Sequence, residues 1–400
     1  MFNRVIRENY LNQLISFKDK DVIKVVSGIR RCGKSTLFDI YCDYLKQNGV
    51  DEKQIIKINL EDPKYYQIDN FMKLYNHIVE LLSPDEMNYI FIDEVQNISE
   101  FQKAIDGLYI KDNCDVYITG SNAFLLSGEL ATLLSGRYVE IKMLPFSFNE
   151  YLSCFEDKTD IIKKYQNYIQ FGSFPYITKL ENPEDKLAYL DGIYSSIVLK
   201  DIIARNKISN VGVLESLIKF MFDNVGNLCS STKIANTMTS NGMKVSYKTI
   251  DSYLNALTES FILYKATRYD IKGKQHLSTG AKYYLSDMGL RFYLLGAKPA
   301  DHGHLLENII YLELLRRGNK VYIGKCDNKE VDFYTIKNGE NEYYQVAYSA
   351  IDENTLKREL SSLENIASHD AKYLITMDFI PKTSHNGIKQ LNALDWLMNK

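Results

Sequence analysis

A glycine-rich stretch near the N-terminus holds the residues best suited to chemistry. It reads GIRRCGKS from Gly28 to Ser35, and it lies between an apolar strand and a helical pattern that ends near Gly49. Glycines let successive backbone amides point inward, and a helix N-terminus behind them favours negative charge. Lysine in this spacing reaches the outer phosphates of a nucleotide, and the next hydroxyl reaches Mg²⁺. The residues expected to hold ATP are Gly28, Ile29, Arg30, Arg31, Cys32, Gly33, Lys34, Ser35 and Thr36.

Two acids end a second apolar run. NYIFIDEV places Asp93 and Glu94 directly after a strand pattern. In nucleotide hydrolases such an acid holds Mg²⁺, directly or through water, and a neighbouring group orients the attacking water. We therefore expect Asp93 and Ser35 to bind Mg²⁺, and Glu94 to act with Lys34 in catalysis. Acids after an apolar strand are common, so this pattern gains its weight from the glycine loop.

Other polar residues follow the next two strand patterns. After CDVYITG, we take Asn122 as the first candidate to sense the γ-phosphate and Thr119 as the second; a helix cap at Ser121 or Asn122 is an equal alternative. Arg137 begins the following strand and is expected to neutralise charge in the transition state, in its own subunit or across a homo-oligomer contact. The alternative is a structural arginine paired with an acid.

The strand patterns of the first 150 residues alternate with helical stretches. This alternation predicts an α/β fold with a doubly wound parallel sheet, and a nucleotide-binding domain over residues 1–150. The expected strands are 22–26, 55–60, 89–93, 115–120 and 138–143.

The middle of the chain is predicted to be helical. Residues 151–210 are expected to form a lid or linker, and residues 211–298 show the order helix, short helix, helix, hairpin that is typical of a winged helix. In a DNA-binding version, Tyr247, Lys248 and Thr249 begin the recognition helix. The basic wing is formed by Arg268, Lys272, Lys274 and His276. A winged helix used for packing or subunit contact is an equal alternative.

Residues 299–400 alternate helices and strands in the order of a restriction-endonuclease-like core. An active nuclease needs two or three acids to hold metal and a lysine to orient water. Glu307 and Asp332 supply two acids, but Gln345 and Ala347 stand where an acid and a lysine are needed. Lys357 on the next helix is the candidate replacement. We therefore expect a degenerate nuclease-like α/β domain.

Composition narrows the function classes. The 400 residues are 45% hydrophobic, with a net charge of −3 and a pI near 6.1, so any DNA binding must use local patches. None of the six cysteines forms a C-x-x-C pair, and no run reaches the roughly 18 apolar residues of a membrane helix. We expect a cytoplasmic protein with no membrane partner.

Seven segments of the chain, given at the end of this paragraph, resemble in their order the segments of prokaryotic AAA+-type ATPases of the archaeal-ATPase-like group. The resemblance implies ATP and Mg²⁺ at the glycine loop and the acid pair, and a C-terminal domain of unknown function formed by a winged helix and a nuclease-like fold. The expected activity is ATP hydrolysis coupled to DNA binding or remodelling; a signalling or scaffold ATPase that binds protein and an ATP-dependent nuclease are the alternatives. The segments that resemble the group are VVSGIRRCGKSTL, IFIDEVQ, ITGSNAFLLSGELATLLSGRYVEIKMLPFSFNEYL, FGSFP, AKYYLSDMGL, HLLENIIYLELLRRG and EVDF.

Overall fold

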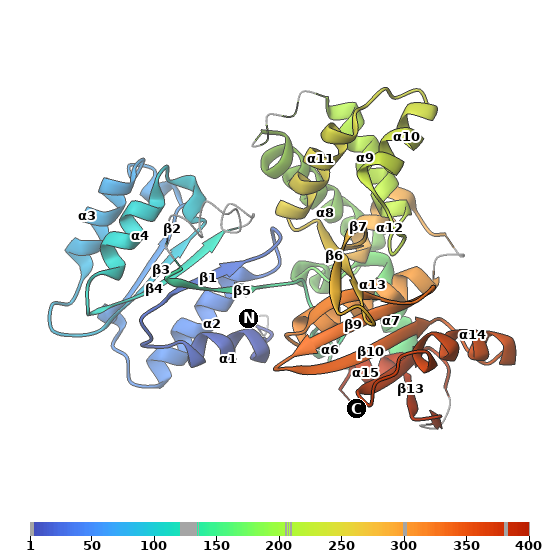
Figure 1. Cartoon of the computed structure of the whole chain (residues 1–400). Coiled ribbons are helices and arrows are strands. Elements are labelled where there is room, and N and C mark those ends of the chain that lie inside the picture. The colour runs from blue at the N-terminus through green and yellow to red at the C-terminus, as the bar shows by residue number, and fades with distance from the viewer. Residues whose placement is uncertain are drawn as a thin grey trace. The chain divides into compact units, whose positions relative to one another are not determined.

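The chain divides into two compact units, Met1–Pro145 with Glu259–Phe261, and Phe146–Thr258 with Ile262–Lys400. The computed structural model describes residues 4–120, 134, 136–204, 206, 208, 210–298, 302–379 and 383–399. The sequence predicts a first domain that ends at residue 150 and three further parts, 151–210, 211–298 and 299–400. The structure packs those three parts into one unit (Figure 1).

The described residues of the first unit form the parallel sheet that the sequence predicts. Its strand order is β2-β3-β4-β1-β5, and every pair is parallel. The strands are β1 (Ile23–Ser27), β2 (Ile55–Asn59), β3 (Asn88–Asp93), β4 (Cys114–Gly120) and β5 (Tyr138–Lys142). The helices are α1 (Glu8–Ser16), α2 (Lys34–Gln47), α3 (Phe71–Leu81) and α4 (Phe101–Tyr109), with 3-10 turns η1 (Glu52–Gln54), η2 (Pro63–Tyr65) and η3 (Val95–Asn97).

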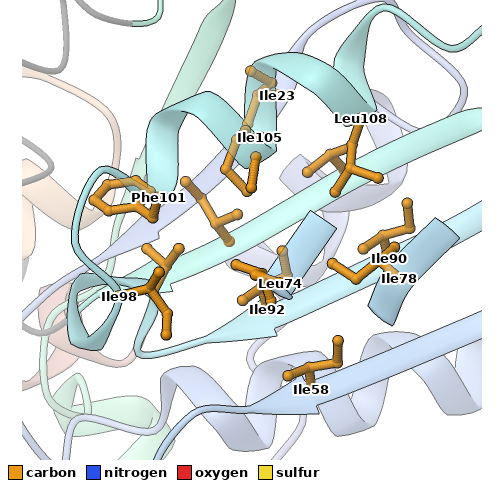
Figure 2. Close-up of a cluster of buried hydrophobic side chains, with 14 of the residues drawn as sticks. Ile23, Ile58, Leu74, Ile78, Ile90, Ile92, Ile98, Phe101, Ile105 and Leu108 are labelled. Atoms are coloured by element: carbon orange, nitrogen blue, oxygen red, sulfur yellow. The ribbon is translucent and has the colours of Figure 1, made fainter. Parts of the chain in front are cut away.

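Both faces of this sheet are covered, because successive side chains of a strand point to opposite faces. Ile90 and Ile92 of β3 belong to a buried cluster with residues of α3 and α4. Phe91, between them, meets the ring of Phe38 on α2 at 5.1 Å. Figure 2 shows the first face, where the labelled side chains are Ile23, Ile58, Leu74, Ile78, Ile90, Ile92, Ile98, Phe101, Ile105 and Leu108. With both faces buried, the carboxyl edge of the sheet is the place for a ligand.

The second unit contains a mixed sheet of order β12-β13-β11-β10-β9-β8-β6-β7 in its described residues. Helices α13 (His302–Arg316) and α14 (Glu353–Glu364) pack on opposite faces: Phe333 meets the ring of Tyr311 on α13, whereas its neighbour Tyr334 shares a buried cluster with Leu360 of α14. The strands are β6 (Leu263–Asp270), β7 (Gln275–Leu285), β8 (Lys320–Cys326), β9 (Lys329–Lys337), β10 (Glu340–Ala347), β11 (Ala371–Thr376), β12 (Thr383–His385) and β13 (Ile388–Asn392).

The helical part of this unit contains the three helices and the hairpin expected after residue 211. The hairpin β6–β7 is not a free wing, because β6 also pairs in parallel with β8. An unpaired strand edge is a liability, and this pairing covers the edge of β6 and leaves β7 as the edge strand. The helices are α6 (Phe148–Ser153), α7 (Ile161–Phe171), η5 (Pro175–Lys179), α8 (Pro183–Ser196), the π-helical η6 (Ile197–Ala204), α9 (Val211–Asp223), α10 (Ser231–Ser240), α11 (Tyr247–Glu259), α12 (Met288–Leu295) and α15 (Ala393–Leu397). In the described part of the chain, no helix is long and apolar enough to cross a membrane.

Two segments that carry the family resemblance, FGSFP and LSDMGL, meet inside the second unit. The buried carboxylate of Asp287 accepts hydrogen bonds from the backbone N–H and the hydroxyl of Ser173, at 2.6 and 2.7 Å, and it caps α12 through Gly289. A Cβ at Gly172 would lie 2.1 Å from Asp287, so only glycine fits there. These segments therefore hold α7 and α12 together, and packing explains their residue types.

Candidate functional site

The glycine loop joins β1 to α2 at the carboxyl edge of the parallel sheet. Gly33 precedes the helix with φ 105°, a left-handed conformation that favours glycine. A Cβ at Gly28 would lie 2.1 Å from the Met143 carbonyl oxygen, so this position has no room for a side chain. Both glycines are thus required by the backbone. The loop delivers the N-terminal amides of α2 to the sheet edge, where an anion is favoured.

Lys34 lies on the first turn of α2 with its side chain directed back over the loop. It is buried, and its ammonium donates hydrogen bonds to the carbonyl oxygens of Gly28, at 3.0 Å, and Ile29, at 3.3 Å. Ser35 and Thr36 beside it are exposed. Among the described residues, the partners of this ammonium are neutral carbonyls, and phosphate oxygens are stronger acceptors that can replace them. The loop therefore fits the phosphates of a nucleoside triphosphate.

The two acids that end β3 share a hydroxyl from β4. Thr119 donates a hydrogen bond to a carboxylate oxygen of Asp93 and accepts one from the backbone N–H of Glu94, at 3.1 Å. All three residues are buried, and Glu94 adopts a left-handed conformation with φ 54°. The amide of Gln96 donates to the carboxylate of Glu94. Because β4 lies between β1 and β3, Thr119 stands between the glycine loop and the acids. Asn122, the first candidate sensor, lies outside the described residues.

Arg137 is not at this site. It directly precedes β5, and its carbonyl accepts a hydrogen bond from the N–H of Ile23, the first residue of β1. Its exposed guanidinium lies 5.5 Å from the ring centre of Tyr109. The loop begins at the other end of β1, about 16 Å away for a five-residue strand. The expectation that Arg137 acts within its own subunit is therefore wrong, and action across a subunit contact stays a prediction.

Comparisons with known proteins agree with this geometry. Residues 20–152 match a family described as an AAA domain, and residues 162–301 match a domain of unknown function (DUF8612). An uncharacterized protein of Haemophilus influenzae is 44% identical over 398 residues, 98% of each chain. An uncharacterized protein of Methanocaldococcus jannaschii, MJ1544, is 31% identical over 360 residues, 86% of this chain and 78% of that one. A Walker-type ATPase of Pyrococcus abyssi superposes with a TM-score of 0.51 at 14% identity, covering 73% of this chain and 96% of that chain.

The chain belongs to the same family as these uncharacterized proteins of Haemophilus influenzae and Methanocaldococcus jannaschii, and it contains an AAA domain. The AAA domain covers the first sheet and its glycine loop. The likeness to the Pyrococcus protein, at 14% identity, bears on the fold alone.

In the second unit of this AAA-domain protein, the expected nuclease-like residues surround an unexpected lysine. Lys282 of β7 is buried, and its ammonium lies 3.0 Å from Glu307 on α13 and 3.0 Å and 3.6 Å from Glu330 and Asp332 on β9. The hydroxyl of Tyr284 also donates to Glu307, at 2.7 Å. Sequence reasoning missed Lys282, although it belongs to the AKYYLSDMGL segment that had no assigned role.

The residues proposed for cleavage chemistry do not form a metal site. Gln345 faces Asp332 from β10, with its amide oxygen 3.4 Å from the Asp332 backbone N–H, and its amide nitrogen donates to Glu359 at 2.9 Å. Lys357 is exposed and pairs with Glu353 on the same helix, and its replacement of the missing lysine stays a prediction. Across the described residues, no three His, Cys, Asp or Glu side chains are arranged to hold a metal ion.

Burial and charge act against each other in this cluster. Burial and the neighbouring Glu307 raise the pKa of Asp332 to about 7. Burial also opposes ionisation of Glu307, but Lys282, His304 and Tyr284 outweigh it and hold that pKa below its ordinary value. Burial disfavours charge on Lys282, and the three carboxylates around it outweigh burial and raise its pKa. Lys282 and Glu307 therefore stay charged, and Asp332 titrates near neutral pH.

The residues expected to contact DNA differ in their surroundings. Tyr247 is 55% exposed, and Lys248 beside it is exposed at the start of α11. Lys272 is 3.0 Å from Asp327, and its backbone N–H bonds to Asp270. In the described residues, the buried Nε of Arg268 has no hydrogen-bond partner. Lys274 is exposed, with φ 50°. Acids thus neutralise part of the basic hairpin, whereas the start of α11 stays accessible.

Replacing Thr119 with valine should slow ATP turnover about 10- to 100-fold. Valine keeps the shape but removes a hydrogen bond to a charged group, worth about 1.5–3 kcal/mol. Thr119→Ser restores the hydroxyl and is the matched control. Steady-state ATPase assays of both variants provide the test, and turnover equal to wild type in Thr119→Val would show that the hydroxyl does not position the acids.

Asp332→Asn should change how stability depends on pH. The folded pKa of Asp332, about 7, lies above its ordinary 3.8. Its contribution to the free energy of unfolding is therefore fully present below pH 3.8 and is lost as pH rises through 7. Glu307 acts in the opposite direction, and its contribution is lost only as pH falls below its ordinary 4.5. Between pH 5 and 8, the free energy of unfolding of the wild-type protein should therefore fall by about 1–3 kcal/mol more than that of the variant.

Urea unfolding at several pH values measures this difference. Asp327→Asn is the matched control, because Asp327 is exposed and follows β8 next to β9 in the same sheet. Equal slopes for wild type and Asp332→Asn over this range would contradict the titration assigned to Asp332.

Proposed function

We propose that this protein binds and hydrolyses ATP with Mg²⁺ at the carboxyl edge of the first sheet, and that nucleotide state controls DNA binding by the second unit. The observation that carries the first part is the shared Thr119 hydroxyl, which fixes the two acids of β3 beside the strand that leads into the glycine loop. The loop with its lysine, the two acids and Thr119 thus come together from three separate segments of the chain.

Each side chain has a distinct role in this proposal. Lys34 binds the outer phosphates with its ammonium, and the amides at the start of α2 bind the phosphate oxygens. Ser35 and Asp93 would hold Mg²⁺, which supplies positive charge that stabilises the departing phosphate. Glu94 accepts a proton from the attacking water through its carboxylate, and the amide of Gln96, which donates to Oε2 of that carboxylate, helps to orient it.

DNA is the proposed partner, and the exposed start of α11 supports it. Tyr247 offers a ring for stacking, and Lys248 offers a charge for a phosphate contact. The order α9, α10, α11, β6–β7 also supports a winged-helix arrangement of this region. The hairpin is the weaker contact, because Lys272 pairs with Asp327.

The nuclease alternative is disfavoured by Lys282. The Lys282 ammonium pairs with the carboxylates of Glu307, Glu330 and Asp332, which a metal ion would need as ligands. We infer that this region is nuclease-like in fold and that its buried ion cluster holds β7, α13 and β9 together. Cleavage of DNA by the purified protein that is lost in Asp332→Ala would overturn this inference.

Lys34→Ala and Glu94→Gln should separate ATP binding from hydrolysis. Lys34→Ala removes the charge that binds the outer phosphates, so most ATP affinity should be lost. Glu94→Gln keeps the loop, so ATP should bind while turnover falls about 100-fold or more, as expected for loss of a general base. Lys46→Ala, an exposed lysine on the same helix, is the matched control. Wild-type turnover in Glu94→Gln would remove Glu94 from this role.

Charge reversal should locate the DNA contact. Lys248→Glu should weaken DNA binding and reduce the slope of log K against log salt by roughly 0.9 for the lost phosphate contact. Lys272→Glu with Lys274→Glu should have a smaller effect, because Lys272 already has an acidic partner. Lys389→Glu, an exposed change on β13, is the control. Titrations at several salt concentrations, with and without ATP, test this, and no binding by wild type at low salt would favour a protein partner.

A further inference from the structure

A buried arginine near the N-terminus joins the glycine loop to the chain that leaves the first unit. The guanidinium of Arg7, at the start of α1, donates to the carbonyl of Cys32 in the loop, at 3.1 Å. It also donates to the carbonyls of Leu144, at 2.8 Å, and Pro145, at 3.2 Å. Arg7 is only 3% exposed. One side chain thus bonds to two segments of backbone that are more than 100 residues apart in sequence.

The same two segments also touch without Arg7. We use the name connector for residues 143–145, which follow β5 and end at the last residue of the first unit before Phe146. The N–H of Met143 bonds to the Ser27 carbonyl at 2.7 Å, and the Met143 carbonyl lies against Gly28. The N–H of Leu144 donates to the hydroxyl of Tyr10 at 3.2 Å. The connector therefore contacts the start of the loop through Met143 and α1 through Leu144.

We propose that Arg7 is a positioning residue that couples the glycine loop to the connector, so that nucleotide binding changes the connector and, through it, the chain entering the second unit. The proposal rests on the proposed ATPase function. Phosphate binding acts on the loop backbone, to which the Cys32 carbonyl belongs. A planar guanidinium with fixed donor directions passes a shift of one carbonyl to the other two, because it cannot keep all three bonds unless they move together.

The matched variants are Arg7→Met, Arg7→Lys and Arg4→Met. Arg4 lies three residues before Arg7 in the segment that leads into α1. It is exposed, and it pairs with Asp39 and Asp43 on the surface. Arg7→Met removes all three bonds. Arg7→Lys keeps the charge but cannot reproduce the fork geometry, so it should retain part of the effect.

Hydrogen exchange of the peptide spanning residues 143–148 and ATP titration form the experiment. In wild type, ADP, and ATP in a Glu94→Gln background, should each change exchange in this peptide. Arg7→Met should raise the Kd for ATP about tenfold, because the binding-competent loop becomes a minor state, and its connector exchange should no longer respond to nucleotide. Arg4→Met should behave as wild type.

The outcomes separate the two proposals. Wild-type protein that fails to bind ATP would remove the proposed function itself. Wild-type protein that binds ATP with unchanged connector exchange, or Arg7→Met that keeps the nucleotide response, would overturn the coupling and leave Arg7 a purely structural residue. If Arg7→Met does not fold, the wild-type measurement and a reduced response in Arg7→Lys still decide the question.

Discussion

One hydroxyl group at the end of β4 holds the acids on which the nucleotide site depends. Asp93 ends β3 and Glu94 directly follows it, yet their roles require different directions, and Thr119 bonds to the side chain of Asp93 and the backbone of Glu94. This arrangement is possible only because β4 lies between β1 and β3 in a parallel sheet, where all carboxyl ends meet at one edge. The site therefore depends on the strand order, and the buried faces of the sheet that fix this order also support the site.

The sequence predicted those parts of the molecule that depend on local pattern. The strands of the first unit, its parallel sheet and the glycine loop follow from apolar runs and from residue spacing over a few positions. The sequence left open whether Arg137 acts in its own subunit or across a subunit contact, because its position along the chain does not reveal which edge of the sheet it occupies. Lys282 was missed, and Lys357 was preferred, because a partner supplied by β7 to α13 and β9 is a long-range contact that no local spacing indicates. The role of Arg7 was not predicted either, because its bonds to Cys32, Leu144 and Pro145 are also long-range contacts.

The two buried lysines show how the partners of a cation decide what it can do. Lys34 bonds to neutral carbonyls, each bond worth about 1.5–3 kcal/mol because the donor is charged, and phosphate oxygens, which are charged acceptors, can replace them. Lys282 is held by carboxylates, and separating a buried charged pair by removal of one partner costs about 3–5 kcal/mol. The first lysine is therefore poised for a ligand, and the second is already satisfied. Residue type and burial are similar, and only the neighbouring acceptors differ.

The ion cluster also bears on how the second unit can respond to the first. The hairpin β6–β7 shares a sheet with the nuclease-like strands through β8, and Lys282 ties β7 to α13 and β9. Moving the helical part against the C-terminal sheet would break backbone pairing and expose buried charges at the same time. Such a change costs far more than the 1–3 kcal/mol typical of coupling between sites. The second unit should therefore respond as one piece, and a nucleotide signal that enters at Phe146 would act on the whole unit rather than on the helices after residue 211 alone.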